Sequence, residues 1–261
     1  PIALQVAEAL EGGAFPVVFP FSEGVSAAEE DGRIAGVLSR GTLLELEPEV
    51  LAQILEQGPE ALRVVIPRAA GPALVLDVVA SSPFAEGFSV FAASDRENAV
   101  AVELGRYYRG IISGQEHTLA AVSFHPDEVR AVIATGQGDL VVGKMLDERG
   151  SGHILYNDVD LLVIPEGECG TDNLPPLPHD RPSHEPMPGV RVTSNTVNVY
   201  VEIDHDIYQD KGTVQACLSF MAGLFHEVAT LYANDTISVA MSEVLVWDVN
   251  SPYSCSSSGD C

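Results

Sequence analysis

The sequence predicts an α+β protein in which a β-rich module, a sandwich-like antiparallel sheet, is followed by a β-α-β unit. Three observations lead to this fold class. Short apolar runs recur between polar turns over residues 97–164, a proline-rich stretch occupies 165–189, and a strand–helix–strand pattern fills 197–249. We therefore expect a β-rich domain at 1–164, a linker at 165–189 and a second domain at 190–261.

The N-terminal part predicts a mixture of helix and strand. EPEVLAQILEQG (47–58) has apolar residues at helical spacing and ends at a Gly-Pro pair, which predicts a short amphipathic helix. Residues 63–67 and 73–79 are apolar, β-branched runs on either side of a second Gly-Pro pair. Both are expected to be strands, as is the short run at 88–93.

The pattern between residues 97 and 164 is that of consecutive β-strands. Polar or glycine-containing turns separate the apolar runs, and short strands at this spacing are typical of a sandwich or a curled antiparallel sheet. The expected strands are 99–104, 108–113, 118–124, 129–135, 140–146 and 153–164.

The residues after the proline-rich stretch have a more regular pattern. VNVYVEIDHDIY (197–208) alternates apolar and polar residues, which predicts a strand with one buried face. Residues 215–235 carry apolar side chains at helical spacing, and 236–249 alternate again. A strand, a helix and a strand in this order predict a right-handed crossover within a parallel sheet.

The charge balance excludes some partners. The chain has 38 acidic against 13 basic residues, a net charge of −25. Such a surface repels nucleic acid and anionic lipid, so neither is expected to bind. No apolar run reaches the roughly 18 residues of a membrane span. We expect a secreted protein whose signal peptide, if it had one, has been removed. Its acidity fits ordinary solubility or a marine or halophilic source.

The C-terminal segment resembles the opening of reprolysin-like (adamalysin-like) metzincin peptidases, especially the microbial members. In that family a first strand leads into a long helix, and the second strand ends near a Trp-Asp pair that a Pro-Tyr turn follows. Trp247, Asp248, Pro252 and Tyr253 occupy these places. The resemblance implies that residues 190–261 are the N-terminal portion of a metzincin-like α/β peptidase domain.

The resemblance extends upstream and covers roughly residues 100–253. YYRGIISGQEHTLAAVSFHPDEVRAVIATGQGDLVVG is similar to the propeptide of the same family. This implies a propeptide and the N-terminal part of a zinc-dependent endopeptidase. The implied partners are the remainder of the peptidase domain and protein or peptide substrates.

The zinc-binding motif of these enzymes is missing from the sequence. Metzincins hold zinc with an H-E-x-x-H helix and use its Glu as general base. His226 begins the nearest match, HEVAT, but Thr230 stands where the second His belongs. We therefore expect no catalytic residue in this chain, no activity by itself, and a zinc helix beyond Cys261. His226 is expected to be an exposed or half-buried helix residue.

The four cysteines have different expected roles. The resemblance implies that Cys169 is a cysteine switch, whose thiolate takes the open position on the zinc and excludes water. The residues alone leave two alternatives open, a disulfide with Cys217 and a free thiol. Cys255 and Cys261 bracket a Ser/Gly run and are disulfide candidates.

Two further interpretations follow from the acidic and β-rich character of the chain. Acidic pairs such as Asp158 with Asp160, and Asp204 with Asp206, are candidate calcium ligands, although solvated strand ends explain them more simply. The alternative to a peptidase precursor is a non-catalytic extracellular structural protein. Such a protein would self-assemble into filaments or a surface layer by adding strands at exposed sheet edges.

Overall fold

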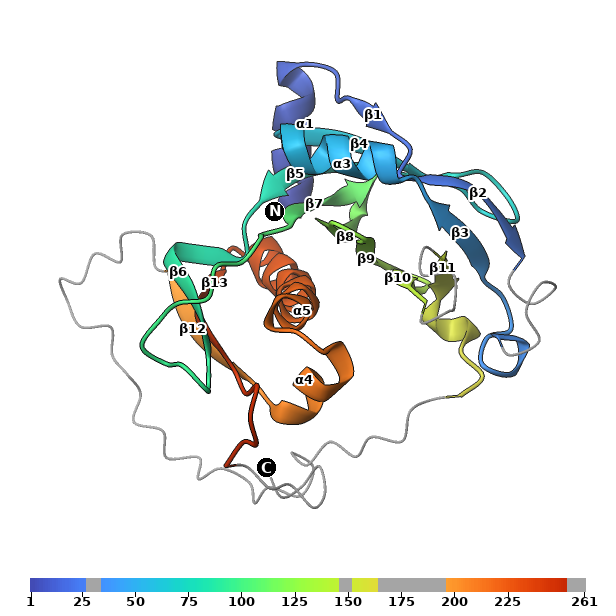
Figure 1. The fold of residues 1–261 in the computed structure, drawn as a ribbon. Coiled ribbons are helices and arrows are strands. Elements are labelled where there is room, and N and C mark those ends of the chain that lie inside the picture. The colour runs from blue at the N-terminus through green and yellow to red at the C-terminus, as the bar shows by residue number, and fades with distance from the viewer. Residues whose placement is uncertain (27–33, 146–151, 164–195, 253–261) are drawn as a thin grey trace, which may run out of the picture.

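The computed structural model forms two β-sheets that share one long helix (Figure 1). The expected linker at 165–189, together with Tyr253, Cys169, Cys255 and Cys261, lies outside the described residues. The structure describes residues 1–26, 34–145, 152–163 and 196–252.

The larger sheet has ten strands and curls into a half-barrel, antiparallel throughout except where β1 pairs with β4. Alternate residues of its strands face inward, as the burial pattern of β4 shows. In sheet order the strands are β1 (Val17–Val18), β4 (Ala61–Ile66), β5 (Leu74–Ser81), β7 (Arg106–Ile112), β8 (Gln115–His125), β9 (Glu128–Thr135), β10 (Gly138–Lys144), β11 (Gly152–Asn157), β3 (Thr42–Leu46) and β2 (Phe21–Ser26).

The inside of the half-barrel is the main hydrophobic core, and helix α3 (Pro48–Gln57) packs into it at one end. The helix places Leu51 and Ile54 in this core, and its left-handed C-cap is Gly58. At the same end the hydroxyl of Tyr108 donates to the carbonyl of Pro59 at 2.9 Å. This end of the half-barrel is therefore closed.

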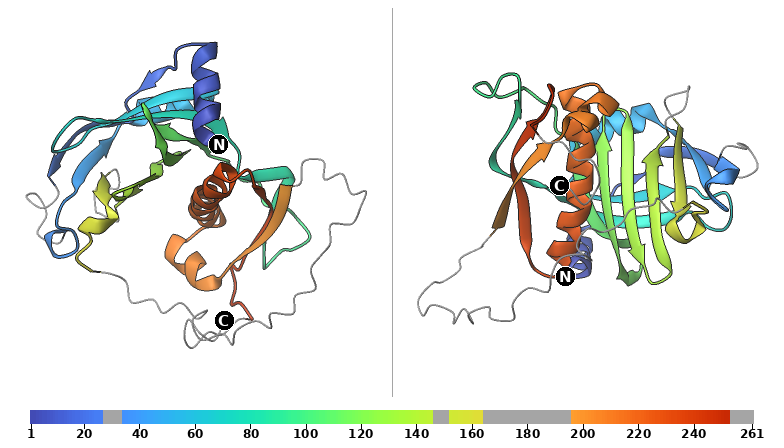
Figure 2. Two further views of the ribbon diagram at one scale, coloured as in Figure 1. Left: turned by 180° about the vertical axis from the view of Figure 1, so that it is seen from behind. Right: turned by 90° about the horizontal axis from the view of Figure 1, so that it is seen from below.

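The smaller sheet is parallel and consists of β12 (Thr196–Ile203), β13 (Ser238–Val246) and β6 (Phe84–Ala92), in that order. Helix α4 (His205–Lys211) and helix α5 (Val214–Asn234) lie between β12 and β13 in the chain. Helix α5 packs against β13 on one side and against the outer face of β8 on the other (Figure 2). Helix α1 (Ile2–Gly12) covers the same outer face over β5, β7 and β8.

Helix α5 joins the two sheets because it is apolar over much of its surface. Its N-cap Thr213 accepts a hydrogen bond from the backbone N–H of Ala216 at 3.1 Å. Cys217 and Leu218 face the core beneath the small sheet. Its length and composition also suit a membrane span, but core helices pass the same test, and here it is packed between two sheets.

The predicted fold class is wrong. The N-terminal strands form one curled sheet around a core rather than two facing sheets, since neighbouring antiparallel strands pair successively from β7 to β11. The C-terminal strand, helix and parallel strand do follow one another, but they form no separate β-α-β unit. Strand β6 from the N-terminal part completes their sheet. The domain boundaries stay a prediction.

Three predicted strand ranges also differ from the structure. Residues 99–104 form no strand, because the side chain of Gln215 bonds both backbone groups of Glu103, at 2.8 and 2.9 Å. The strand expected at 197–208 ends at Ile203, where Asp204 caps α4. The strand expected at 153–164 is β11, which ends at Asn157, and Asn157 caps a short 3-10 helix.

Candidate functional site

Of the four cysteines, the structure describes Cys217 alone. Cys169, Cys255 and Cys261 lie outside the described residues, so the switch and the disulfide stay predictions. Cys217 is a free thiol that is fully buried on α5, and burial raises its pKa. A thiol in this environment is a core residue rather than a reactive group.

The Trp-Asp pair of the family resemblance docks the end of β13 onto the loop that follows β6. Asp248 accepts hydrogen bonds from the backbone N–H and the hydroxyl of Ser94. Arg96 lies over the Trp247 ring at 4.7 Å from its centroid, and the Trp247 indole donates to Glu202 at 2.8 Å. These contacts tie residues near 95 to residues near 247.

His226 is buried, so the prediction of an exposed or half-buried residue is wrong. Only 2% of its surface is exposed, because its ring contacts Ser81 and Tyr107 where α5 packs on the outer face of the large sheet. Its Nε2 lies 2.9 Å from the hydroxyl oxygen of Ser81, and its ring lies 5.4 Å from that of Tyr107. His125, 1% exposed, also contacts the Tyr107 ring, with 5.6 Å between the ring centroids.

The two buried histidines beside Tyr107 are held in the neutral state. Burial, together with the positive charge of Arg109, lowers the pKa of His226 to about 3. Burial together with the charge of Arg130 lowers the pKa of His125 to about 4. Neither imidazole nitrogen of His125 has a hydrogen-bond partner in the described part of the chain, and neither has Nδ1 of His226.

The Ser81–His226 contact resembles a nucleophile and its base, but the surroundings do not support that chemistry. A catalytic histidine needs a pKa near the working pH and a third group that orients its ring. Here the pKa is near 3, Nδ1 has no partner among the described residues, and the nearby charge on Arg109 is positive. The geometry therefore favours binding over nucleophilic catalysis.

A cavity of about 170 Å³ adjoins this contact, between α5 and strands β5, β7 and β13. Its polar walls include the guanidinium group of Arg109 and the hydroxyl of Thr230. Nε of Arg109 and Oγ1 of Thr230 are buried without a partner among the described residues. Unpaired buried polar atoms are costly, which makes this cavity the strongest candidate binding site. The cavity is lined by Ser81, Ser82, Arg109, His226, Ala229, Thr230, Ala233, Ser238 and Val239.

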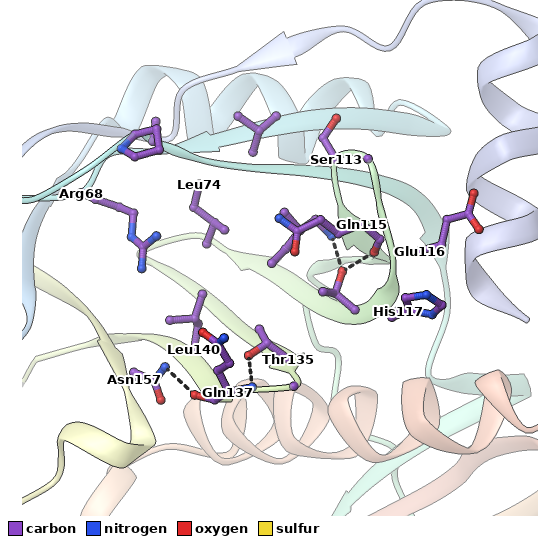
Figure 3. A pocket seen from close by; sticks show the side chains of 17 residues that line it. Arg68, Leu74, Ser113, Gln115, Glu116, His117, Thr135, Gln137, Leu140 and Asn157 are labelled. Atoms are coloured by element: carbon purple, nitrogen blue, oxygen red, sulfur yellow. Dashed lines mark hydrogen bonds between the residues drawn. The ribbon is translucent and has the colours of Figure 1, made fainter.

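The open end of the half-barrel is a second and wider candidate, with a volume of about 1170 Å³ (Figure 3). It lies at the turns after β7 and β9, away from the end that α3 closes. Leu74 and Leu140 are apolar lining residues, while Arg68, Gln115 and Gln137 are among the polar ones. This mixture of apolar surface and hydrogen-bonding groups suits noncovalent binding.

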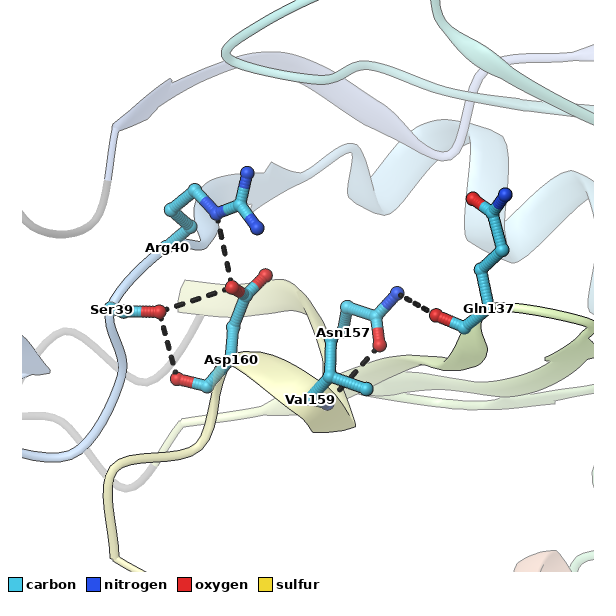
Figure 4. Close-up of polar contacts among 6 residues, drawn as sticks. All are labelled: Ser39, Arg40, Gln137, Asn157, Val159 and Asp160. Carbon is cyan, nitrogen blue, oxygen red and sulfur yellow. Dashed lines mark hydrogen bonds and ion pairs between the residues drawn. The ribbon is translucent and has the colours of Figure 1, made fainter.

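A smaller recess of about 570 Å³ adjoins the open end, and it contains one of the predicted calcium ligands. Asp160 accepts hydrogen bonds from Ser39 and from Arg40, each at 3.0 Å (Figure 4). Asn157 donates to the carbonyl of Gln137 at 3.3 Å. Asp160 therefore already has a cationic partner, and calcium binding here stays a prediction.

The described residues do not fit a zinc site. No group of three His, Cys, Asp or Glu side chains in that part of the chain is placed to hold a metal ion. We therefore assign no catalytic step to zinc in these residues.

Sequence reasoning missed the cavity beside α5. Its residues come from four separate elements, and no spacing motif connects them. The one available signal was polar: Arg109 lies within the predicted strand 108–113, Ser81 and His125 directly follow predicted strands, and the predicted helix contains His226 and Thr230.

Comparison with known proteins adds only distant structural likeness. No family model matches the sequence, and no curated protein matches it. The crystal structure of metalloproteinase-II from Bacteroides fragilis aligns with a TM-score of 0.31 and 8% sequence identity. The alignment covers 79% of this chain and 58% of that chain, so this chain spans less than two thirds of the neighbour. A TM-score this low does not establish a common fold.

Proposed function

We propose that the chain is the propeptide and N-terminal part of a secreted, zinc-dependent endopeptidase, and that it is inactive by itself. One structural observation carries this proposal: β6 of the N-terminal part is the third strand of the sheet that β12 and β13 form. A propeptide that keeps a peptidase latent must bind the peptidase part firmly, and strand addition is a strong way to do so.

The contacts around β6 supply this binding. Val90 pairs with Val244 and Phe91 with Leu245 in the parallel register, and Val90 is buried in the core beneath the small sheet. The Ser94–Asp248 hydrogen bond extends the junction beyond the end of the strands. The segment that resembles a peptidase thus pairs with residues of the proposed propeptide domain, 1–164.

The opposite edge of the small sheet is open among the described residues. β12 pairs only with β13 there, and Val197 and Tyr200 on β12 are 53% and 49% exposed. Parallel sheets are usually covered on both faces, and exposed apolar edge strands invite pairing. We propose that the remainder of the peptidase domain, which carries the zinc site, packs beside β12.

The same open edge also favours the alternative function, a structural protein that assembles through strand addition. In that case the partner at β12 is another copy of the chain. Light scattering on residues 1–261 separates the two functions. A monomer at micromolar concentration supports the peptidase precursor, whereas filaments or large oligomers support assembly.

The activity of the natural reading frame that contains this chain tests the proposed function. We expect no peptide hydrolysis before cleavage within 165–189, hydrolysis after cleavage, and loss of that activity on zinc chelation. Residues 1–164 added back in excess should inhibit the released enzyme. A natural protein without an H-E-x-x-H helix, or one fully active without cleavage, would contradict the proposal.

A cysteine variant tests the proposed switch in the same assay. Cys169→Ser removes the zinc-binding thiolate and should raise the activity of the uncleaved precursor. Cys217→Ala is the matched control, because Cys217 is a buried free thiol on α5. Equal latency in the wild type and in Cys169→Ser would remove the switch from the proposal while leaving the propeptide in place.

A further inference from the structure

We propose that the cavity between α5 and strands β5, β7 and β13 binds a small oxyanion of the phosphate or sulfate type. The inference rests on the cavity itself and does not depend on the proposed peptidase function. The residues that line this cavity are Ser81, Ser82, Arg109, His226, Ala229, Thr230, Ala233, Ser238 and Val239.

The first argument is an unneutralised cation. Arg109 lines the cavity, and no carboxylate forms an ion pair with it in the described part of the chain. Burial alone lowers the pKa of this guanidinium, and no acidic group acts to raise it. Arginine stays charged in proteins, so the cavity holds a net positive charge in a molecule whose net charge is −25. An anion would supply the missing partner.

The second argument is the set of hydrogen-bonding groups around that charge. Nε of Arg109, Nδ1 of His226 and Oγ1 of Thr230 are buried and have no partner among the described residues. His226 and Thr230 are each 2% exposed, so neither reaches bulk solvent. The hydroxyl of Ser81, which contacts His226, lines the same space. Several donors around one cavity suit the oxygens of a tetrahedral anion.

The third argument concerns charge selection and access. No Asp or Glu is among the residues that line the cavity, although 38 occur in the chain. The cavity volume of about 170 Å³ is several times the roughly 30 Å³ that a water molecule occupies in the liquid. Ser82 and Ser238 are exposed at its rim, so an ion can enter from solvent.

Thermal unfolding in sulfate or in inorganic phosphate tests the proposal, with sodium chloride keeping the ionic strength constant. A ligand that binds only the folded state raises the Tm in a saturable way. We expect Arg109→Gln to weaken binding about 10- to 100-fold, as expected when a charged hydrogen-bond donor is lost. Arg130→Gln is the matched control. Arg130 lies on β9, pairs with Glu227 of α5, and does not line the cavity.

Two further measurements keep the test decisive if Arg109→Gln unfolds. Thr230→Val preserves the side-chain shape and should weaken binding by a smaller factor. In NMR titrations, saturating sulfate should raise the pKa of His226. Sulfate also stabilises proteins without binding, so an equal, unsaturable rise in the wild type and all variants would overturn the proposal. In that case water alone fills the cavity.

Discussion

Two buried histidines beside Tyr107, His125 and His226, make the stability of the junction between α5 and the half-barrel depend on pH. Both rings contact Tyr107, and both are flanked by a positive charge, Arg130 for His125 and Arg109 for His226. Protonation would place further positive charge in a buried site where no carboxylate of the described residues pairs with Arg109. The neutral state of these two rings is therefore part of what keeps the junction stable.

We predict that stability falls as the pH drops from about 6.5 to 4. In the unfolded chain the histidines have pKa values near 6.5. In the folded chain the pKa is about 4 for His125 and about 3 for His226. The unfolded state thus binds more protons in this window, so the stabilisation is complete above it and is lost below. Each histidine contributes a slope of at most about 1.4 kcal/mol per pH unit.

The variant His226→Gln isolates this contribution in urea unfolding at pH 7, 6 and 5. Half-buried Glu128 and Glu227 oppose the trend, because partial burial raises their pKa values and their protonation favours the folded state. These residues are the same in both proteins, so the wild type should lose on the order of 1–2 kcal/mol more than the variant. Parallel pH profiles would refute the role of His226.

At this scale the sequence predicted little of the site. The apolar spacing of residues 215–235 identifies a helix but does not say which second layer covers its polar side. The burial of His226 and Thr230 follows from the packing of α5 between β8 and β13, and no local pattern encodes that packing. A helix between two sheets buries polar residues that would face solvent in an ordinary surface helix.

Among the elements, the pairing of β5 with β7 depends on a glycine. A Cβ added at Gly110 would overlap the backbone carbonyl of Asp77. We predict that Gly110→Ala destabilises the protein by about 3 kcal/mol, because the two strands cannot separate without breaking their hydrogen bonds. Gly143→Ala in β10 is the control, since nothing lies within 4 Å of its added Cβ. Equal unfolding midpoints for the two variants would contradict this account.

The N-terminus of α5 provides a second prediction for a single element. Thr213→Ala removes the side-chain acceptor for the Ala216 N–H and should cost about 1 kcal/mol. Thr213→Ser keeps the hydroxyl and should cost much less. Because α5 packs against both sheets, chemical denaturation should show one cooperative transition in both variants. If Thr213→Ala lowered the unfolding midpoint of the small sheet alone, α5 would not couple the unfolding of the two sheets.

Most elements were predictable from local patterns. Helix α3 and strands β4, β5 and β7 to β10 match the expected ranges within a few residues, since one face of each is apolar at the correct period. The range 99–104 was wrong for a nonlocal reason: the Gln215 side chain, far along the chain, takes the backbone bonds that a neighbouring strand would otherwise make.

For the whole molecule, the decisive feature is a strand pairing between distant parts of the chain. β6 pairs with β13 although about 150 residues separate them, and the alternation in each strand fits many partners. The sequence pattern therefore indicated the strands but neither the curled single sheet nor the sheet that the two parts share. The same pairing underlies the proposed propeptide role.

Cleavage of the chain within 165–189 at a single engineered protease site tests this pairing most directly. We predict that the fragments on either side co-elute in size-exclusion chromatography, because β6 and α5 hold them together. Val90→Asp places a charge in the core beneath the small sheet and should separate them, whereas Val159→Asp at an exposed position should not. Fragments that separate after cleavage of the wild type would contradict the shared sheet and the latency proposed from it.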